Sequence, residues 1–263
     1  MLTERSARVV AAVKLHRQIA RRRAQRFLAE GPNLVEAAAR RGLVREVFVT
    51  ESAARRHSAL LAGSSAPVEL VTERAAKALS DTVTPAGLVA VCELPAADLD
   101  AVLRAEPELI AVAVGIGEPG NAGTLIRIAD AMGAAAVVLT GHSVDPYNGK
   151  CLRASTGSVF SVPVIVAADT GGTLTALRDT GLQMLATAPD GEVSLDDAES
   201  LLRRRTAWLF GPEAHGLDPA ALLAADQRVR IPMPGAAESL NVAAAAAICL
   251  YQSARAQRSD RPG

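Results

Sequence analysis

Several features that would point to particular classes of protein are scarce in this 263-residue sequence. Cys92, Cys151 and Cys249 are its three cysteines, and they match no spacing of a zinc site or a disulfide framework. We therefore expect no metal, and buried reduced thiols in a cytoplasmic protein. No run of eighteen apolar residues is present, so we expect no membrane span. The charged N-terminus also lacks the apolar segment of a signal peptide.

Aromatic residues contribute only 3 % of the sequence, yet apolar residues overall reach 49 %, enough for one large or two modest domains. The net charge is zero but unevenly spread, because residues 1–60 hold 13 Lys/Arg against 5 Asp/Glu. The densest basic stretch contains Arg17, Arg21, Arg22, Arg23 and Arg26. Such a stretch indicates either a surface for a polyanion or a solvated helix face.

The N-terminal part alternates helical and strand patterns. We expect helices at 4–30, 33–41, 52–61 and 73–80, and strands at 44–50, 68–71 and 87–92. These elements predict a small α/β domain over residues 1–95. Residues 96–107 contain acidic residues and end at Pro107, which is typical of a linker.

Residues 108–263 repeat the alternation on a larger scale. Apolar segments predict strands at 109–116, 135–140, 162–166, 183–187, 207–210 and 228–231, with helices between most of them. Strand–helix alternation favours a parallel sheet covered by helices. A last helix, rich in alanine, is expected to open at Ser239.

A glycine pattern follows the first of these strands. Gly115, Gly117 and Gly120 spell G-x-G-x-x-G, as in dinucleotide-binding proteins. That site also requires an acidic residue at the end of the next strand, and Thr140 occupies this region instead. The pattern therefore gives only weak support to a nicotinamide-dependent oxidoreductase.

Three other stretches combine loop glycines with polar side chains. The first contains Asn121, expected at a helix N-cap, and Arg127, whose apolar neighbours predict partial enclosure. The second, LFGPEAHG, places Glu213 in a turn after a strand, where a purely structural turn needs no carboxylate. The third, IPMPGAAESLN, places Ser239 and Asn241 at the last helix, where they either cap it or serve a site.

Together these stretches read N-x-G-x-x-x-R, F-G-P-E-x-x-G and I-P-M-x-x-x-x-x-S-L-N. Their order and spacing resemble the three motifs of the SpoU, or TrmH-like, family of RNA 2′-O-methyltransferases. Arg153 and Ser155 lie in a segment similar to the family's R-A-S-x-G. Phe27 to Val91 resembles, more loosely, the L30e-like substrate-binding domain of many members, especially those acting on ribosomal RNA or conferring thiostrepton resistance.

The resemblance implies a C-terminal parallel-sheet trefoil-knot domain of the SPOUT kind behind an L30e-like N-terminal domain. It implies S-adenosylmethionine as cofactor, a homodimer formed through the C-terminal domain with each site completed across the interface, and an RNA partner. The expected cofactor-binding residues are Gly211, Ile231, Leu240, Thr187 and Ala188. The expected RNA-binding residues are Arg21, Arg22, Arg23, Arg26, Arg153 and Ser155.

The resemblance also implies transfer of a methyl group to a ribose 2′-oxygen, with 23S ribosomal RNA favoured as substrate. Arg127 matches the arginine often proposed as base, but arginine normally keeps its proton, so a phosphate-gripping role stays open. Asn121 and Asn241 are expected to shape the site and contact substrate, Glu213 to orient Arg127 or its partner residue, and Ser239 to complete the polar set. The alternatives are a transfer-RNA methyltransferase or an inactive RNA-binding member.

Overall fold

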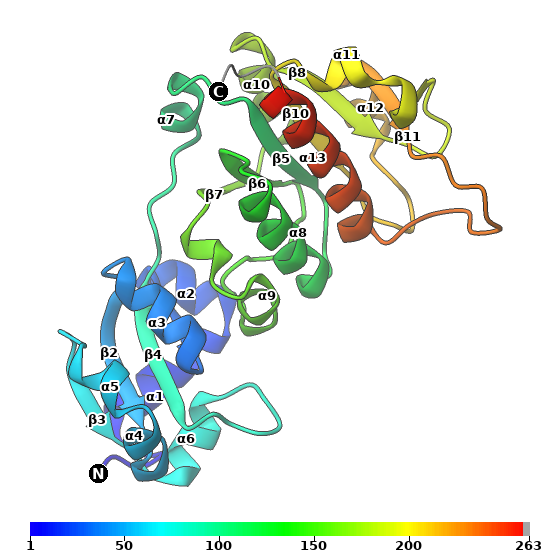
Figure 1. Cartoon of the computed structure of the whole chain (residues 1–263). Helices are drawn as coiled ribbons and strands as arrows, with labels where there is room; N and C mark the ends of the chain where they lie inside the picture. The colour runs from blue at the N-terminus through cyan, green and yellow to red at the C-terminus, as the bar shows by residue number, and fades with distance from the viewer. Residues whose placement is uncertain (260–263) are drawn as a thin grey trace. The chain divides into compact units, whose positions relative to one another are not determined.

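The computed structural model describes residues 1–259 and divides into two compact units (Figure 1). The first comprises Met1–Ala96 together with Tyr147–Phe160, and the second comprises residues 97–146 and the chain from 161 onward. One division between the two units lies between Ala96 and Ala97. The segment 147–160, by contrast, packs with the first unit although it lies in the sequence range expected for the second. Residues 260–263 of that range lie outside the described part.

The first unit is built on a four-stranded sheet of order β1-β4-β2-β3. Its strands are β1 (Arg26–Glu30), β2 (Val44–Val49), β3 (Val68–Leu70) and β4 (Leu88–Glu93), with β4 antiparallel to β1 and β2. Apolar side chains of the sheet and of the helices α1 and α6 form a core that includes Val9, Phe48, Leu79 and Val89. The helices of this unit are α1 (Ala7–Val13), η1 (Lys14–His16), α2 (Gln18–Ala24), α3 (Pro32–Arg40), α4 (Glu51–Arg56), α5 (Ser58–Ala62), α6 (Glu73–Leu79), α9 (Gly149–Ser155) and η2 (Ser158–Phe160).

The expected basic helix over 4–30 is wrong. The backbone becomes extended at Arg17 and left-handed at Gln25, so two short helices and a 3-10 turn precede β1. Phe27, Leu28 and Ala29 are buried in β1, where they pair with β4. The arginines before this strand are good helix formers, so the local sequence favours a longer helix than the one that forms. The expected helix 52–61 is likewise two helices that meet at His57.

Within the described residues, seven parallel strands form the sheet of the second unit, in the order β7-β6-β5-β10-β8-β11-β9. All six residues of β5 are buried, as is typical of a parallel sheet with both faces covered. The predicted α/β class is confirmed, and only the two-residue β9 had no expected counterpart. The strands are β5 (Leu109–Val114), β6 (Ala136–Thr140), β7 (Val164–Ala167), β8 (Gln183–Thr187), β9 (Val193–Ser194), β10 (Thr206–Phe210) and β11 (Gln227–Arg230).

Helices pack against this sheet, and one of them, α7, lies in the expected linker. They are α7 (Leu99–Arg104), α8 (Pro119–Ala131), α10 (Thr170–Asp179), η3 (Leu195–Asp197), α11 (Glu199–Leu202), α12 (Pro219–Ala224) and α13 (Val242–Ser259). Among the described residues, no helix is both long and apolar enough to cross a membrane.

The last helix returns from β11 to the middle of the sheet, where it packs beside α8 and against β5 and β10 (Figure 1). Trp208 anchors it, because the buried indole Nε1 donates a hydrogen bond of 2.8 Å to the Ser253 hydroxyl. The helix begins at Val242 rather than at Ser239. Asn241 caps it, since its Oδ1 accepts from the backbone N–H groups of Ala243 and Ala244. This packing brings the first and third motifs together.

Candidate functional site

A cavity of about 330 Å³ lies at the carboxyl ends of β8, β10 and β11. This is where ligands bind in open parallel α/β sheets. Residues at or just after the carboxyl ends of these strands line the cavity, and the start of α13 closes it. The lining residues are Thr187, Ala188, Pro189, Gly211, Pro212, Glu213, Ala214, His215, Gly216, Val229, Ile231, Met233, Ser239, Leu240, Val242 and Ala245.

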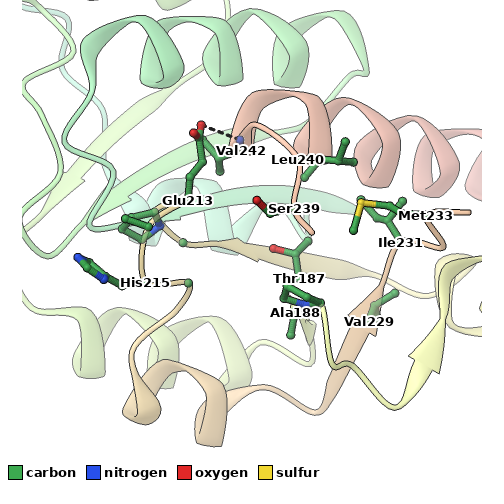
Figure 2. Close-up of a pocket in the computed structure, with 16 residues that line it drawn as sticks. Thr187, Ala188, Glu213, His215, Val229, Ile231, Met233, Ser239, Leu240 and Val242 are labelled. Carbon is green, nitrogen blue, oxygen red and sulfur yellow. Dashed lines mark hydrogen bonds between the residues drawn. The ribbon is translucent and has the colours of Figure 1, made fainter. Parts of the chain in front are cut away.

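The walls of the cavity differ in chemistry from one end to the other (Figure 2). Ile231, Met233 and Leu240 gather at one end, and His215 lies at the other. Glu213 and Ser239 supply polar side chains between these ends. All five residues expected to bind a cofactor line the cavity.

At Gly211, directly after β10, the chain packs closely against the backbone of Gly216 and Leu217. A Cβ atom on this residue would lie 2.5 Å from the Leu217 backbone nitrogen and 2.6 Å from the Gly216 carbonyl carbon. Both atoms belong to the backbone, so neither moves without a shift of the loop. The glycine is therefore required by the shape of the loop that forms one wall of the cavity.

The three motifs meet in one hydrogen-bonded cluster around Glu213. Its Oε1 accepts from Asn121 Nδ2 at 3.0 Å, from Asn241 Nδ2 at 2.6 Å and from the Val242 backbone N–H at 3.1 Å. Asn241 Nδ2 also donates to Asn121 Oδ1 at 3.0 Å. A carboxylate beside the N-terminus of α13 is favourable because the helix dipole is positive there. Glu213 thus ties α8, α13 and the β10 loop into one arrangement.

Two expectations for the first motif are corrected. Glu118, not Asn121, is the N-cap of α8, because its carboxylate accepts from the Asn121 backbone N–H at 2.7 Å. Arg127 is exposed, not enclosed, and it does not line the cavity. Leu125, Ile126 and Ala129 turn one side of α8 inward, and the helical spacing turns Arg127 outward.

The expected RNA-binding residues divide into two groups. Arg22, Arg23 and Arg26 are exposed. Arg21 is only 4 % exposed, and its Nη1 donates to the carbonyl oxygens of Leu15 and His16, so it stabilises the end of η1.

The R-A-S-x-G segment shows the same division. Arg153 is partly exposed and pairs with Asp81. The Ser155 side chain is fully buried and donates to the Leu152 carbonyl at 2.9 Å. The structure therefore assigns packing roles to Arg21 and Ser155, which corrects their expected place on an RNA-binding surface.

Sequence reasoning missed several lining residues. Pro189 and Pro212 each follow a residue that had been expected in the site, and Met233 lies within the third motif. The available signal was their position directly after predicted parallel strands. His215 occupies one of the two unspecified positions of F-G-P-E-x-x-G, yet it lines the cavity.

The fold and the site define a two-unit α/β protein with a small-molecule cavity at the strand ends of its parallel sheet. The chain belongs to the SpoU rRNA Methylase family, whose sequence profile matches residues 108–251. A second profile, the MRM3-like substrate binding domain, matches residues 7–90. The resemblance deduced from the three motifs is thereby confirmed.

Individual relatives cover nearly the whole chain. The 23S rRNA (guanosine(2553)-2′-O)-methyltransferase RlmP of Bacillus subtilis is 36 % identical over 242 residues, covering 90 % of this chain and 92 % of the relative. A crystal structure of an RNA 2′-O ribose methyltransferase matches with a TM-score of 0.81 and 35 % identity, covering 98 % and 99 % of the two chains. The SpoU methyltransferase AviRb of Streptomyces viridochromogenes, in complex with AdoMet, matches with a TM-score of 0.84 and 31 % identity, covering 97 % of this chain and 100 % of that one.

Proposed function

We propose that this protein is an S-adenosylmethionine-dependent RNA ribose 2′-O-methyltransferase that acts on 23S ribosomal RNA in the cytoplasm. The observation that carries the proposal is the convergence of all three motifs on Glu213, which lines the cavity. RlmP, the relative that covers 90 % of this chain, is a 23S rRNA 2′-O-methyltransferase. AviRb, similar over 97 % of the chain, was crystallised with AdoMet.

The cavity fits this cofactor in both shape and chemistry. Its apolar end, formed by Ile231, Met233 and Leu240, suits a flat adenine ring. A Cβ atom at Gly211 would collide with the backbone at Gly216 and Leu217, so the loop that forms this wall requires a glycine there. Thr187 adds a hydroxyl between these two walls. When bound, S-adenosylmethionine supplies an electrophilic methyl group.

The protein's own residues then have to place the ribose and accept or release its hydroxyl proton. Asn121 and Asn241 are locked by Glu213, which leaves their side chains with little freedom beside the cavity. We assign these three residues to holding the geometry of the site. The Ser239 hydroxyl lines the cavity and is assigned to the substrate side of the same cluster.

Arg127 requires a different explanation, because it does not line the cavity of its own chain. It projects from α8, and α8 packs beside α13. Ile248 and Tyr251, large side chains of α13, are 36 % and 50 % exposed. We propose that a second copy of the chain covers these helices, and that Arg127 of each copy enters the site of the other. There the guanidinium would bind a phosphate of the RNA or accept the proton of the ribose 2′-hydroxyl.

The test is methyl transfer in vitro. Unmodified 23S ribosomal RNA made by transcription should accept one methyl group from S-adenosylmethionine at a ribose 2′-oxygen, located by mass spectrometry of nuclease fragments. Transfer-RNA transcripts should not be modified. Calorimetry should detect binding of S-adenosylmethionine and none of NAD. Modification of transfer RNA alone would redirect the proposal to the second substrate class, and binding of NAD alone would refute it.

The proposed dimer has its own measurement. Tyr251→Arg should convert the protein to monomers in sedimentation analysis, because it places a charge where an apolar side chain would be covered. Since Tyr251 is half exposed, the change should leave the fold intact. A wild-type protein that sediments as a monomer would rule the arrangement out.

A further inference from the structure

The first unit contains a cavity of its own, of about 220 Å³. It lies among β1, α3, α6 and the segment 147–153, all of which belong to that unit. The buried Arg21 lines it, and so do five leucines that are at most 8 % exposed. These are Leu15, Leu28, Leu34, Leu79 and Leu152. Neither the three motifs nor the cofactor site uses this cavity.

A fixed carboxylate lines the cavity beside these leucines. Glu30 Oε1 accepts hydrogen bonds from the hydroxyls of Ser80 and Thr82, the second at 3.0 Å. The other oxygen of Glu30 accepts from none of the residues that the structure describes. An ionised carboxylate is an acceptor only, so a ligand that meets this oxygen has to bring an N–H or O–H donor.

The exposed part of the lining carries both signs of charge, because it includes Lys150, His16 and Asp81. Lys150 is exposed, and Arg153 is partly exposed with its guanidinium paired to Asp81. A guanidinium suits phosphate because its N–H groups match the geometry of the phosphate oxygens. The buried ring of Tyr147, whose centroid lies 5.2 Å from that of Phe27, adds an aromatic wall.

Buried leucines, the Glu30 carboxylate and the basic side chains of Lys150 and Arg153 together match a single nucleotide. The flat base of an unpaired nucleotide buries apolar surface and offers N–H donors at its edge, while its phosphate stays outside. The volume is below the range of about 300–1,000 Å³ found for drug-sized ligands, which suits one base.

We propose that this cavity captures one unpaired base of the RNA substrate, which donates an N–H group to Glu30 while Arg153 and Lys150 hold the flanking phosphate. This proposal rests on the proposed function, because it takes the substrate to be RNA. It adds a recognition site outside the methyl-transfer site. It also gives a role to part of the segment 147–160, which is flanked in sequence by the second unit yet lines a cavity of the first.

The experiment compares matched pairs of variants in the full-length protein, with transcribed 23S ribosomal RNA as the probe. Glu30→Gln keeps an acceptor for Ser80 and Thr82 but removes the charge, and should raise the KM for RNA about tenfold. The kcat at saturating RNA and the affinity for S-adenosylmethionine should not change. Glu36→Gln is the control, because Glu36 is an exposed acid of α3 paired with Arg40.

The arginines form the second pair. Arg153→Ala should weaken RNA binding and reduce the slope of log affinity against log salt by about one. Arg40→Ala removes an arginine from an exposed ion pair of the same unit and should change neither by more than about twofold. Ultraviolet crosslinking of wild-type protein to the RNA should attach nucleotides to the peptide that contains Tyr147 and Lys150.

The outcomes separate this proposal from the one on which it rests. If wild-type protein methylates no RNA, the proposed function fails, and the cavity proposal fails with it. If wild-type protein is active but Glu30→Gln and Glu36→Gln have the same KM, the cavity proposal alone is refuted. Crosslinks that avoid the peptide 147–153 would also refute it, even if a variant does not fold.

Discussion

Gly211→Ala is the smallest change that tests the cofactor site. The added Cβ would lie 2.5 Å from the Leu217 nitrogen and 2.7 Å from the Gly216 carbonyl oxygen. Ordinary van der Waals contacts of a Cβ begin near 3.4 Å, so the backbone at 216–217 has to move by about 1 Å. Residues 212–216 lie between Gly211 and the point of collision, and all five line the cavity. The shift of the backbone should therefore displace residues 212–216, which line the proposed cofactor cavity.

The expected size follows from this geometry. Inserting a methyl group into a tightly packed site costs about 1–3 kcal/mol, and that loss should appear in the free energy of unfolding. The displaced wall should weaken S-adenosylmethionine binding at least about tenfold, which corresponds to about 1.4 kcal/mol. Gly211→Val should have the larger effect on both, because it adds two more methyl groups against the same backbone.

Calorimetric titration with S-adenosylmethionine and urea unfolding measure the two effects. Gly235→Ala is the matched control, since a Cβ at Gly235 meets no atom within 4 Å and the residue lies in the loop before α13. That variant should bind the cofactor like the wild type. The reasoning is refuted if folded Gly211→Ala binds the cofactor as tightly as Gly235→Ala does.

Three further predictions concern other parts of the chain. Arg127→Ala should leave cofactor binding within a few fold but slow methyl transfer by about 10²–10⁴-fold, and full activity would transfer its proposed role to Glu213. Arg22→Glu combined with Arg23→Glu should flatten the salt dependence of RNA binding by about one unit of slope for each lost phosphate contact. An unchanged slope would mean that these exposed arginines are only a solvated face. Burial raises the pKa of the Cys92 thiol to about 12, so a thiol reagent at neutral pH should react with it only after unfolding. Rapid reaction of Cys92 in the native protein would contradict this burial.

Most strands of the second unit were predictable because they are short apolar runs between turn signals, whereas the two-residue β9 was not. Leu109–Val114 and Gln183–Thr187 are examples, and their pattern does not depend on which strand is their neighbour. The chemistry of the site was accessible for a similar reason. Glu213 and Asn241 are polar residues at the ends of apolar elements, where packing alone does not require them.

Sequence patterns gave wrong predictions where contacts between distant residues decide whether a side chain is buried or exposed. Arg21 and Arg22 are neighbours in one basic run, yet the carbonyls of Leu15 and His16 bind and bury only Arg21. Arg127 was expected to be enclosed because its sequence neighbours are apolar. Sequence proximity does not say which side of α8 faces the sheet.

The sequence by itself determined the α/β class and several of the residues that line the cavity at the strand ends. These follow from hydrophobic period, turn chemistry and motif spacing, all of which act over a few residues. Only the tertiary structure decided that Glu213 joins Asn121 and Asn241, and that residues 147–160 pack with the first unit. Those arrangements depend on contacts between residues as much as 120 positions apart, as between Asn241 and Asn121. Such contacts form only when the whole sheet and its helices are in place.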